Sequence, residues 1–264
     1  MTPPFRYADV RGARLAYNST GTGSPVIWAH GMNSAAYTQE SAGQFDWRPV
    51  SAEHRLIRYD ARGHGRSSGG TDPLEYTWYE LGQDLLGLIE AVQPPVGPRV
   101  DAMGSSMGSA TILSAVLTRR DRFRRLVLCN PPTFWETRRP TNGVRMGSAQ
   151  LVQDEGIAAL AKLSVDVPAS PALADGKRNI TPIMCTREVL PAVFRGAAQT
   201  DLPPRDQLAT IIQPTLILSW TGDPTHPVSS GEILAEALPN AELHVADTPT
   251  DHATWGQLAA DFLR

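Results

Sequence analysis

The segment VDAMGSSMGS, residues 100–109, decides the fold. It fits the pattern G-x-S-x-G with Gly104, Ser106 and Gly108 in register, and Ser105 occupies the first x position. An apolar run precedes it and a helical pattern, SATILSAVL, follows it. A strand, a sharp turn and a helix around such a serine form a nucleophile elbow, where small residues two positions on either side relieve crowding. The sequence therefore predicts Ser106 as a nucleophile at a helix start, the alternative being a plain Gly/Ser loop.

Short apolar runs alternate with longer amphipathic segments along most of the chain. The predicted strands are residues 14–19, 25–30, 54–60, 99–103, 123–130, 215–220 and 242–247. Between them, residues 77–92, 109–120 and 229–239 repeat apolar side chains with a helical period. This alternation predicts an α/β fold with a mostly parallel sheet flanked by helices.

One long segment, residues 131–213, breaks the alternation. It is rich in proline and contains helical stretches such as residues 148–163, but no convincing strand. Because it lies between two core strands, we predict that it forms a helical cap, or lid. The α/β core is then expected to comprise residues 1–130 and 214–264.

Composition and charge argue against several classes of protein, including nucleic-acid-binding, membrane-spanning and disulfide-rich proteins. The chain has 264 residues, of which 41% are hydrophobic and 19% charged, which suits one globular domain with an inserted subdomain. The net charge of −3 predicts no nucleic-acid or anionic-membrane partner.

No apolar run approaches the length of a membrane span and no signal-like segment opens the chain, so we expect a cytoplasmic protein. The two cysteines, Cys129 and Cys185, predict neither a disulfide framework nor a structural zinc site, and no cofactor or metal is expected.

A serine hydroxyl needs a base, usually a histidine that a carboxylate orients. We predict His252 as the base, because it follows the last predicted strand on a polar stretch, TPTDHATW, before the final helix. Asp223 lies on the loop after the preceding strand and is the predicted acid, with Asp251 and Asp247 as rivals. His226 is interpreted as a neighbour that lines the same loop as Asp223.

Two backbone N–H groups are predicted to form an oxyanion hole. That of Met107 lies at the helix start, where unpaired amides and the helix dipole favour an anion, and that of Met32 lies on the loop after an early strand. For substrate binding the candidates are His30, just before that loop, and Phe134 and Trp135, which enter the predicted cap. Plain packing within the cap is the alternative for the two aromatic residues.

Together these motifs resemble the α/β-hydrolase superfamily. The segments HGMNS, RYDARGHGRSS, GSSMGS, GDPTHP and DHATW follow the order of that family over nearly the whole chain. The stretch RLIRYDARGHGRSSGG, followed by YTWYELGQDLLGLIEA, looks most like the 3-oxoadipate enol-lactonase-like esterases. The resemblance implies a sheet of about eight strands with an antiparallel start, and a cap over the site. The chain departs from the family pattern at Ser109, where glycine is more common, and in the spacing of the glycine before Asp223.

The favoured activity is hydrolysis of a small-molecule carboxylic ester or lactone through an acyl-enzyme intermediate. The same residue types also serve carbon–carbon bond hydrolases and cofactor-free haloperoxidases or perhydrolases, and a non-catalytic ligand-binding homologue is a further alternative. A carbon–carbon bond hydrolase would need a site for a dienol acid, which commonly includes an arginine. The predicted cap contains six candidates, namely Arg138, Arg139, Arg145, Arg178, Arg187 and Arg195. The sequence does not specify the natural substrate or the oligomeric state.

Overall fold

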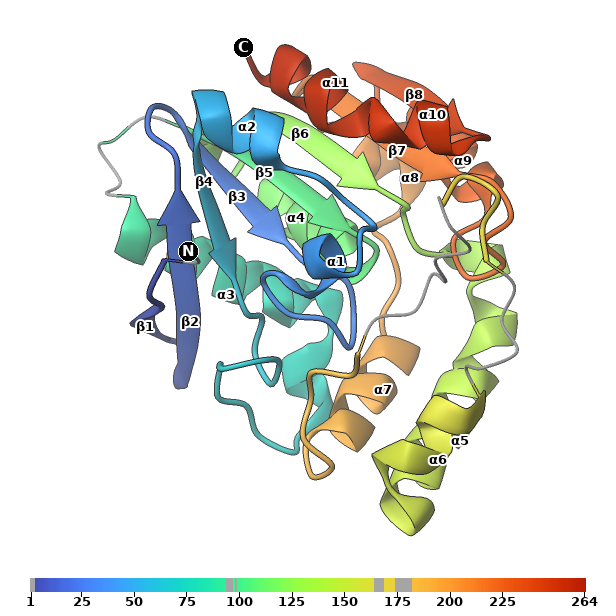
Figure 1. The fold of residues 1–264 in the computed structure, drawn as a ribbon. Helices are drawn as coiled ribbons and strands as arrows, with labels where there is room; N and C mark the ends of the chain where they lie inside the picture. Colours follow the sequence, from blue (N-terminus) through green and yellow to red (C-terminus); the bar gives the residue numbers. More distant parts are fainter. Residues whose placement is uncertain (1–2, 94–96, 98, 164–168, 174–181) are drawn as a thin grey trace.

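The computed structural model describes residues 3–93, 97, 99–163, 169–173 and 182–264 (Figure 1). Its strands are β1 (Arg6–Val10), β2 (Ala13–Thr20), β3 (Pro25–Ala29), β4 (Arg55–Tyr59), β5 (Val100–Ser105), β6 (Phe123–Cys129), β7 (Thr215–Trp220) and β8 (Ala241–Ala246). The α-helices are α1 (Thr38–Ser41), α2 (Arg48–Glu53), α3 (Trp78–Val92), α4 (Met107–Thr118), α5 (Arg139–Glu155), α6 (Ile157–Leu163), α7 (Leu190–Ala198), α8 (Arg205–Leu208), α9 (Val228–Ala237), α10 (Pro249–Ala253) and α11 (Trp255–Leu263). Three short 3-10 helices are η1 (Pro73–Tyr76), η2 (Arg120–Arg122) and η3 (Trp135–Thr137).

All eight strands form one sheet in the order β1-β2-β4-β3-β5-β6-β7-β8. The pairs β1–β2 and β2–β4 are antiparallel, and the remaining pairs are parallel. This confirms the predicted α/β fold with its antiparallel start. The parallel register aligns the carboxyl ends of neighbouring strands, so that Ser105 of β5 pairs with Cys129 of β6. Ligands of open parallel sheets bind at that edge.

Burial along the strands follows their place in the sheet. Every residue of the central strands β3, β5 and β7 is buried, which explains why these segments are continuous apolar runs. The edge strand β8 alternates between partly buried and exposed residues over most of its length.

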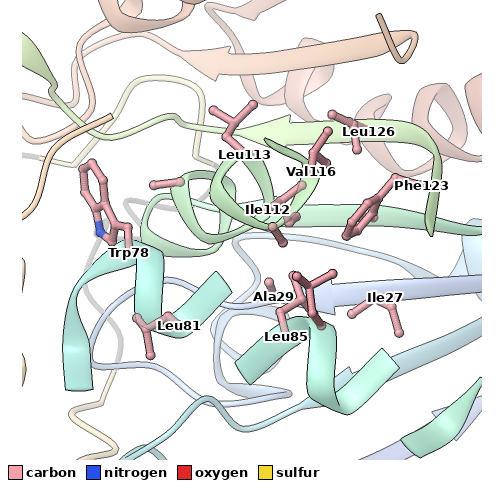
Figure 2. Close-up of a cluster of buried hydrophobic side chains, with 14 of the residues drawn as sticks. Ile27, Ala29, Trp78, Leu81, Leu85, Ile112, Leu113, Val116, Phe123 and Leu126 are labelled. Carbon is pink, nitrogen blue, oxygen red and sulfur yellow. The ribbon is translucent and has the colours of Figure 1, made fainter. Parts of the chain in front are cut away.

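Helices cover both faces of the sheet. On one face, α3 and α4 contribute Trp78, Leu85 and Ile112 to a cluster with Ile27 of β3 and Phe123 of β6 (Figure 2). On the other face, helices α2 and α11 pack together over a second cluster, which contains the buried rings Trp28, Trp47, Trp220 and Trp255. The two clusters fix the sheet rigidly between its helical layers.

Helices α5 to α8 lie between β6 and β7 in the chain, where the cap was predicted. Figure 1 shows α5 and α7 beyond the ends of the central strands, and the two helices pack against each other. No strand occurs in this segment among the residues that the structure describes. Within the described ranges, no helix is both long and apolar enough to cross a bilayer.

Candidate active site

The nucleophile elbow is visible in the backbone at Ser106. This residue joins β5 to α4 with φ 51° and ψ −113°, a conformation that is strained for a non-glycine residue. Its two flanking glycines make the turn possible. A Cβ atom at Gly104 would lie 2.7 Å from the backbone of Gly108, and one at Gly108 would lie 2.0 Å from the carbonyl oxygen of Ala29. Larger side chains at either position would force the turn open.

Ser109, where the sequence departs from the family pattern, is accommodated by two hydrogen bonds. Its buried hydroxyl lies 2.8 Å from the carbonyl oxygen of Gly104 and 3.2 Å from that of Cys129. The same Cys129 carbonyl accepts the Ser106 N–H at 3.0 Å. The serine therefore ties the elbow to the end of β6 where a glycine could not.

His226 is the histidine that contacts Ser106. Its Nε2 atom lies 2.7 Å from the Ser106 Oγ atom, and its Nδ1 atom lies 2.8 Å from Oδ2 of Asp223. Because a carboxylate only accepts hydrogen bonds, Nδ1 carries the proton, which leaves the Nε2 lone pair facing the serine hydroxyl. This is the tautomer that a general base for Ser106 requires.

Asp223 is held ionised by the loop that it organises. Its Oδ1 atom accepts the N–H groups of Thr225 at 2.8 Å and His226 at 3.2 Å, and its Oδ2 atom also accepts the indole N–H of Trp220 at 3.2 Å. Burial by itself would raise the pKa of this carboxyl group. The nearby His226 ring and these donors outweigh burial and lower the pKa to about 2. Asp223 thus carries its charge at any ordinary working pH.

The predicted base, His252, does not occupy the position next to Ser106, and this prediction is corrected. Its Nε2 atom lies 2.7 Å from the carbonyl oxygen of Gln44, and its ring packs edge-on against Trp220 and Trp255. A carbonyl oxygen has no proton to give, so Nε2 of His252 must donate. In this arrangement that nitrogen cannot accept the proton of Ser106.

The sequence just before His252 carries a helix-start signal. Thr248 caps helix α10, accepting the Asp251 N–H, while the Asp251 side chain accepts the Thr248 N–H in return. Pro249 occupies the first turn of this helix. Threonine followed three residues later by an acidic residue, with proline just after the cap, is a helix-start signature. It predicts a short helix that includes His252.

The two backbone N–H groups predicted to form the oxyanion hole belong to Met107 and Met32. Met107 is the first residue of α4, and Met32 lines the cavity that contains Ser106. Neither N–H has a hydrogen-bond acceptor among the described residues. The loop before Met32 is held by Gln39, whose Oε1 atom accepts the Gly31 N–H at 2.9 Å. Sequence reasoning missed this glutamine because no local motif links it to the loop.

The serine and histidine open into a cavity of about 300 Å³. Core residues on its wall include Met32, Ser106, Asn130, Trp220 and His226, and the segment between β6 and β7 adds Arg145, Ser148, Leu160, Ile183 and Phe194. Most of the wall is uncharged. The groups available there are an oriented serine, the histidine hydrogen-bonded to it and a few polar side chains that can fix a small molecule.

The three predicted substrate-binding residues do not line this cavity in the described part of the chain. His30 is buried, its Nδ1 and Nε2 atoms bonded to the backbone of Gly31 and Ala61, and burial lowers its pKa to about 4. Phe134 packs into the core, and the indole N–H of Trp135 donates to Pro203. All three therefore stabilise the scaffold.

Two further polar residues, Asn130 and Arg145, line the cavity. Asn130 is buried at the end of β6, and its Oδ1 atom accepts the Trp220 N–H at 3.2 Å. Its Nδ2 atom has no acceptor among the described residues. Among the described residues, Arg145 of α5 donates only to the neutral oxygens of Thr141 and Asn142. Burial lowers its pKa, an effect that Asp201 partly offsets.

Comparison with known proteins assigns the family. The sequence model of the alpha/beta hydrolase family matches residues 26–263. The chain belongs to the α/β-hydrolase family. This hydrolase is 26% identical over 255 residues to 3-oxoadipate enol-lactonase 2 of Acinetobacter baylyi, covering 92% of this chain and 83% of the relative. It is 25% identical to a 2-hydroxy-6-oxononadienedioate/2-hydroxy-6-oxononatrienedioate hydrolase of Dechloromonas aromatica, covering 95% and 90% of the two chains.

Solved structures show the same similarity. A hydrolase from Pseudomonas aeruginosa superposes with a TM-score of 0.81 at 25% identity, covering 98% of each chain. The enol-lactonase from Burkholderia xenovorans superposes with a TM-score of 0.78 at 25% identity, covering 98% of this chain and 99% of the other. The predicted resemblance to enol-lactonase-like hydrolases is thereby confirmed. The described residues of this hydrolase contain no cluster of three or more His, Cys, Asp or Glu side chains placed to hold a metal ion.

Proposed function

We propose that this hydrolase cleaves a carboxylic ester or lactone through Ser106, His226 and Asp223. The observation that carries the proposal is the continuous hydrogen-bonded chain from Asp223 through His226 to Ser106 at the wall of the cavity. A serine in a strained elbow, a neutral imidazole in the correct tautomer and an ionised carboxylate are the three parts of an acyl-transfer site.

In the first half of the reaction, Ser106 Oγ forms a bond to the carbonyl carbon while its proton passes to Nε2 of His226. The Met32 and Met107 amides stabilise the negative charge on the carbonyl oxygen, a contribution of roughly 10²- to 10³-fold in rate for each such donor. The carbon–oxygen bond to the leaving group then breaks, and His226 returns the proton to that oxygen.

In the second half, water attacks the acyl-enzyme as His226 removes one of its protons. The bond to Ser106 breaks, the serine recovers its proton from His226, and the free acid leaves. Asp223 stabilises the charged imidazolium in both halves without itself taking the proton.

We infer that residues 131–213 act as a cap over this site. Arg145, Ser148 and Phe194, from α5 and α7, line the same cavity as Ser106. Within this cap, Arg145 supports a substrate that carries a carboxylate, because this residue lines the cavity and its guanidinium forms no ion pair with a described residue. Of the other arginines considered, Arg178 lies outside the described residues and Arg138 donates to the backbone of Thr133 and Thr200.

The test is covalent labelling with a fluorophosphonate, followed by intact mass. Wild type and Ser105→Ala should each gain one adduct, and Ser106→Ala should gain none. Positive labelling would then be followed by a screen of esters, lactones and dienol acids, to separate ester hydrolysis from carbon–carbon bond hydrolysis. If wild type neither labels nor turns over any ester, the non-catalytic ligand-binding alternative replaces this proposal.

A further inference from the structure

His252, the residue predicted as the base, does not contact Ser106 but is connected to the active site through hydrogen bonds of other residues. Its Nε2–H group donates to the Gln44 carbonyl oxygen, 2.7 Å away. The ring is held there by edge-on contacts to Trp220 and Trp255, with centroid separations of 5.5 and 5.0 Å. The donor is therefore fixed in direction by packing on two sides.

From Gln44 the contacts continue to the oxyanion loop. The Gln44 N–H donates to the Gln39 carbonyl at 2.9 Å, and the Gln39 Nε2 atom donates to Oε1 of Gln44 at 3.3 Å. The Oε1 atom of the Gln39 side chain accepts the Gly31 N–H, 2.9 Å away. Gln39 Nε2 also donates to the hydroxyl of Ser105 at 3.1 Å. Both glutamines are buried, Gln39 7% and Gln44 2% exposed, so these bonds are shielded from water.

We propose that His252 is a positioning residue, which fixes the oxyanion loop through Gln44 and Gln39. Gly31 immediately precedes Met32, whose N–H is the proposed oxyanion donor, and Ser105 immediately precedes the nucleophile. The two glutamines therefore join the two backbone segments whose separation sets the width of the oxyanion hole. A small change in this separation lowers the rate of the chemical step, because the donors must match the position of the oxyanion in the transition state.

The expected effect on kcat rests on the proposed function. The effect of His252 on the Gly31 loop can be measured by hydrogen exchange, which needs no substrate. The informative pair is His252→Gln and His252→Leu. A glutamine Nε2 can donate to the Gln44 carbonyl much as the histidine Nε2 does, but it cannot act as a base. Leucine can neither donate a hydrogen bond nor act as a base. Gln39→Leu removes the next link. His244→Leu, at an exposed histidine of the adjacent strand β8, is the matched control.

Two measurements are made on each variant. The first is steady-state hydrolysis of 4-nitrophenyl butyrate, with kcat and KM determined separately. The second is hydrogen exchange of the peptide that contains the Gly31 N–H. We expect His252→Leu to lower kcat by roughly 10-fold with KM little changed, and Gln39→Leu to lower kcat by about 10- to 100-fold. The double variant that combines His252→Leu with Gln39→Leu should have a kcat no lower than that of Gln39→Leu alone, because both changes break the same chain of contacts. Exchange around Gly31 should accelerate in both leucine variants.

The conservative variant decides between positioning and base chemistry. His252→Gln should keep kcat within roughly threefold of wild type and preserve slow exchange at Gly31. The proposal is overturned if His252→Gln is as impaired as His252→Leu, because the required property would then not be the N–H donor. It is equally overturned if His252→Leu and Gln39→Leu leave kcat and exchange unchanged.

Failure of the proposed function gives a different pattern. If wild type turns over no ester, the ester mechanism is lost, and the exchange measurement alone decides whether His252 and Gln39 hold the Gly31 loop. If His252→Leu does not fold, Gln39→Leu and His252→Gln still give opposite expectations for exchange at Gly31.

Discussion

The Nε2 atom of His226 lies 2.7 Å from the Oγ atom of Ser106, a residue 120 positions earlier in the chain. This contact places the proposed base and the proposed acid on one loop, since Asp223 is only three residues before His226. The loop follows β7, whose carboxyl end is aligned with that of β6 and, through it, with the serine elbow after β5. The hydrogen-bonded chain thus requires no residue from the segment after β8.

Replacing His226 tests this assignment directly. His226→Gln should lower kcat by roughly 10⁴-fold or more, because Ser106 loses the group that removes its proton. His244→Gln, at an exposed histidine, should leave kcat unchanged and serves as the control. The measurement is the hydrolysis rate of a 4-nitrophenyl ester. A His226→Gln enzyme with near wild-type kcat would return the base role to another histidine.

The elbow glycine Gly108 should be intolerant of any side chain. A Cβ atom there would lie 2.0 Å from the Ala29 carbonyl oxygen, so Gly108→Ala should lower the free energy of unfolding by at least about 2 kcal/mol. At Gly143, on α5, a Cβ atom would meet nothing within 4 Å. Gly143→Ala should therefore be neutral or stabilising by up to about 1 kcal/mol. Urea unfolding of both variants provides the measurement, and equal losses would contradict the crowding argument.

The depressed pKa of Asp223 predicts how stability changes in acid. Because its folded pKa is about 2, below the usual carboxyl value, the charged form stabilises the folded state. This contribution is complete above the unfolded pKa near 4 and is lost as the pH falls through about 2. Relative to Asp223→Asn, the wild-type free energy of unfolding should decrease by about 2 kcal/mol between pH 4.5 and pH 2. Urea titrations at several pH values test this, and parallel curves for the two proteins would argue against it.

Arg145 should determine the charge of the preferred substrate. The test compares the 4-nitrophenyl monoester of glutaric acid with the same ester bearing a methyl group on its free acid. Arg145→Gln should lower kcat/KM for the acid by roughly 10- to 100-fold through KM and leave the methyl ester within about threefold.

Arg139→Gln, on the exposed side of the same helix, is the control for a general loss of positive charge. If wild type shows no preference for the acid, or if Arg139→Gln abolishes the preference equally, the carboxylate does not bind at Arg145.

Much of the fold could be predicted because its signals are local. Fully buried strands such as β7 are continuous apolar runs, and the serine turn needs glycines whose crowding is a matter of a few neighbouring atoms. Asp223 could be chosen by its place after a strand. The same reasoning failed for His252, because two histidines follow the last two strands and their distance from Ser106 is not a local property.

Most strands, the elbow and Ser106 as the candidate nucleophile could thus be predicted from sequence, because periodicity and steric demand act between near neighbours. The order of the strands in the sheet, the histidine that reaches the serine and the residues that line the cavity became known only from the folded chain. Those relationships depend on how β5, β6 and β7 align and on where α10 begins, and contacts across 120 residues leave no trace in local spacing. His252 is directed at Gln44 by the packing of Trp220 and Trp255, and His226 is directed at Ser106 by the carboxylate three residues before it.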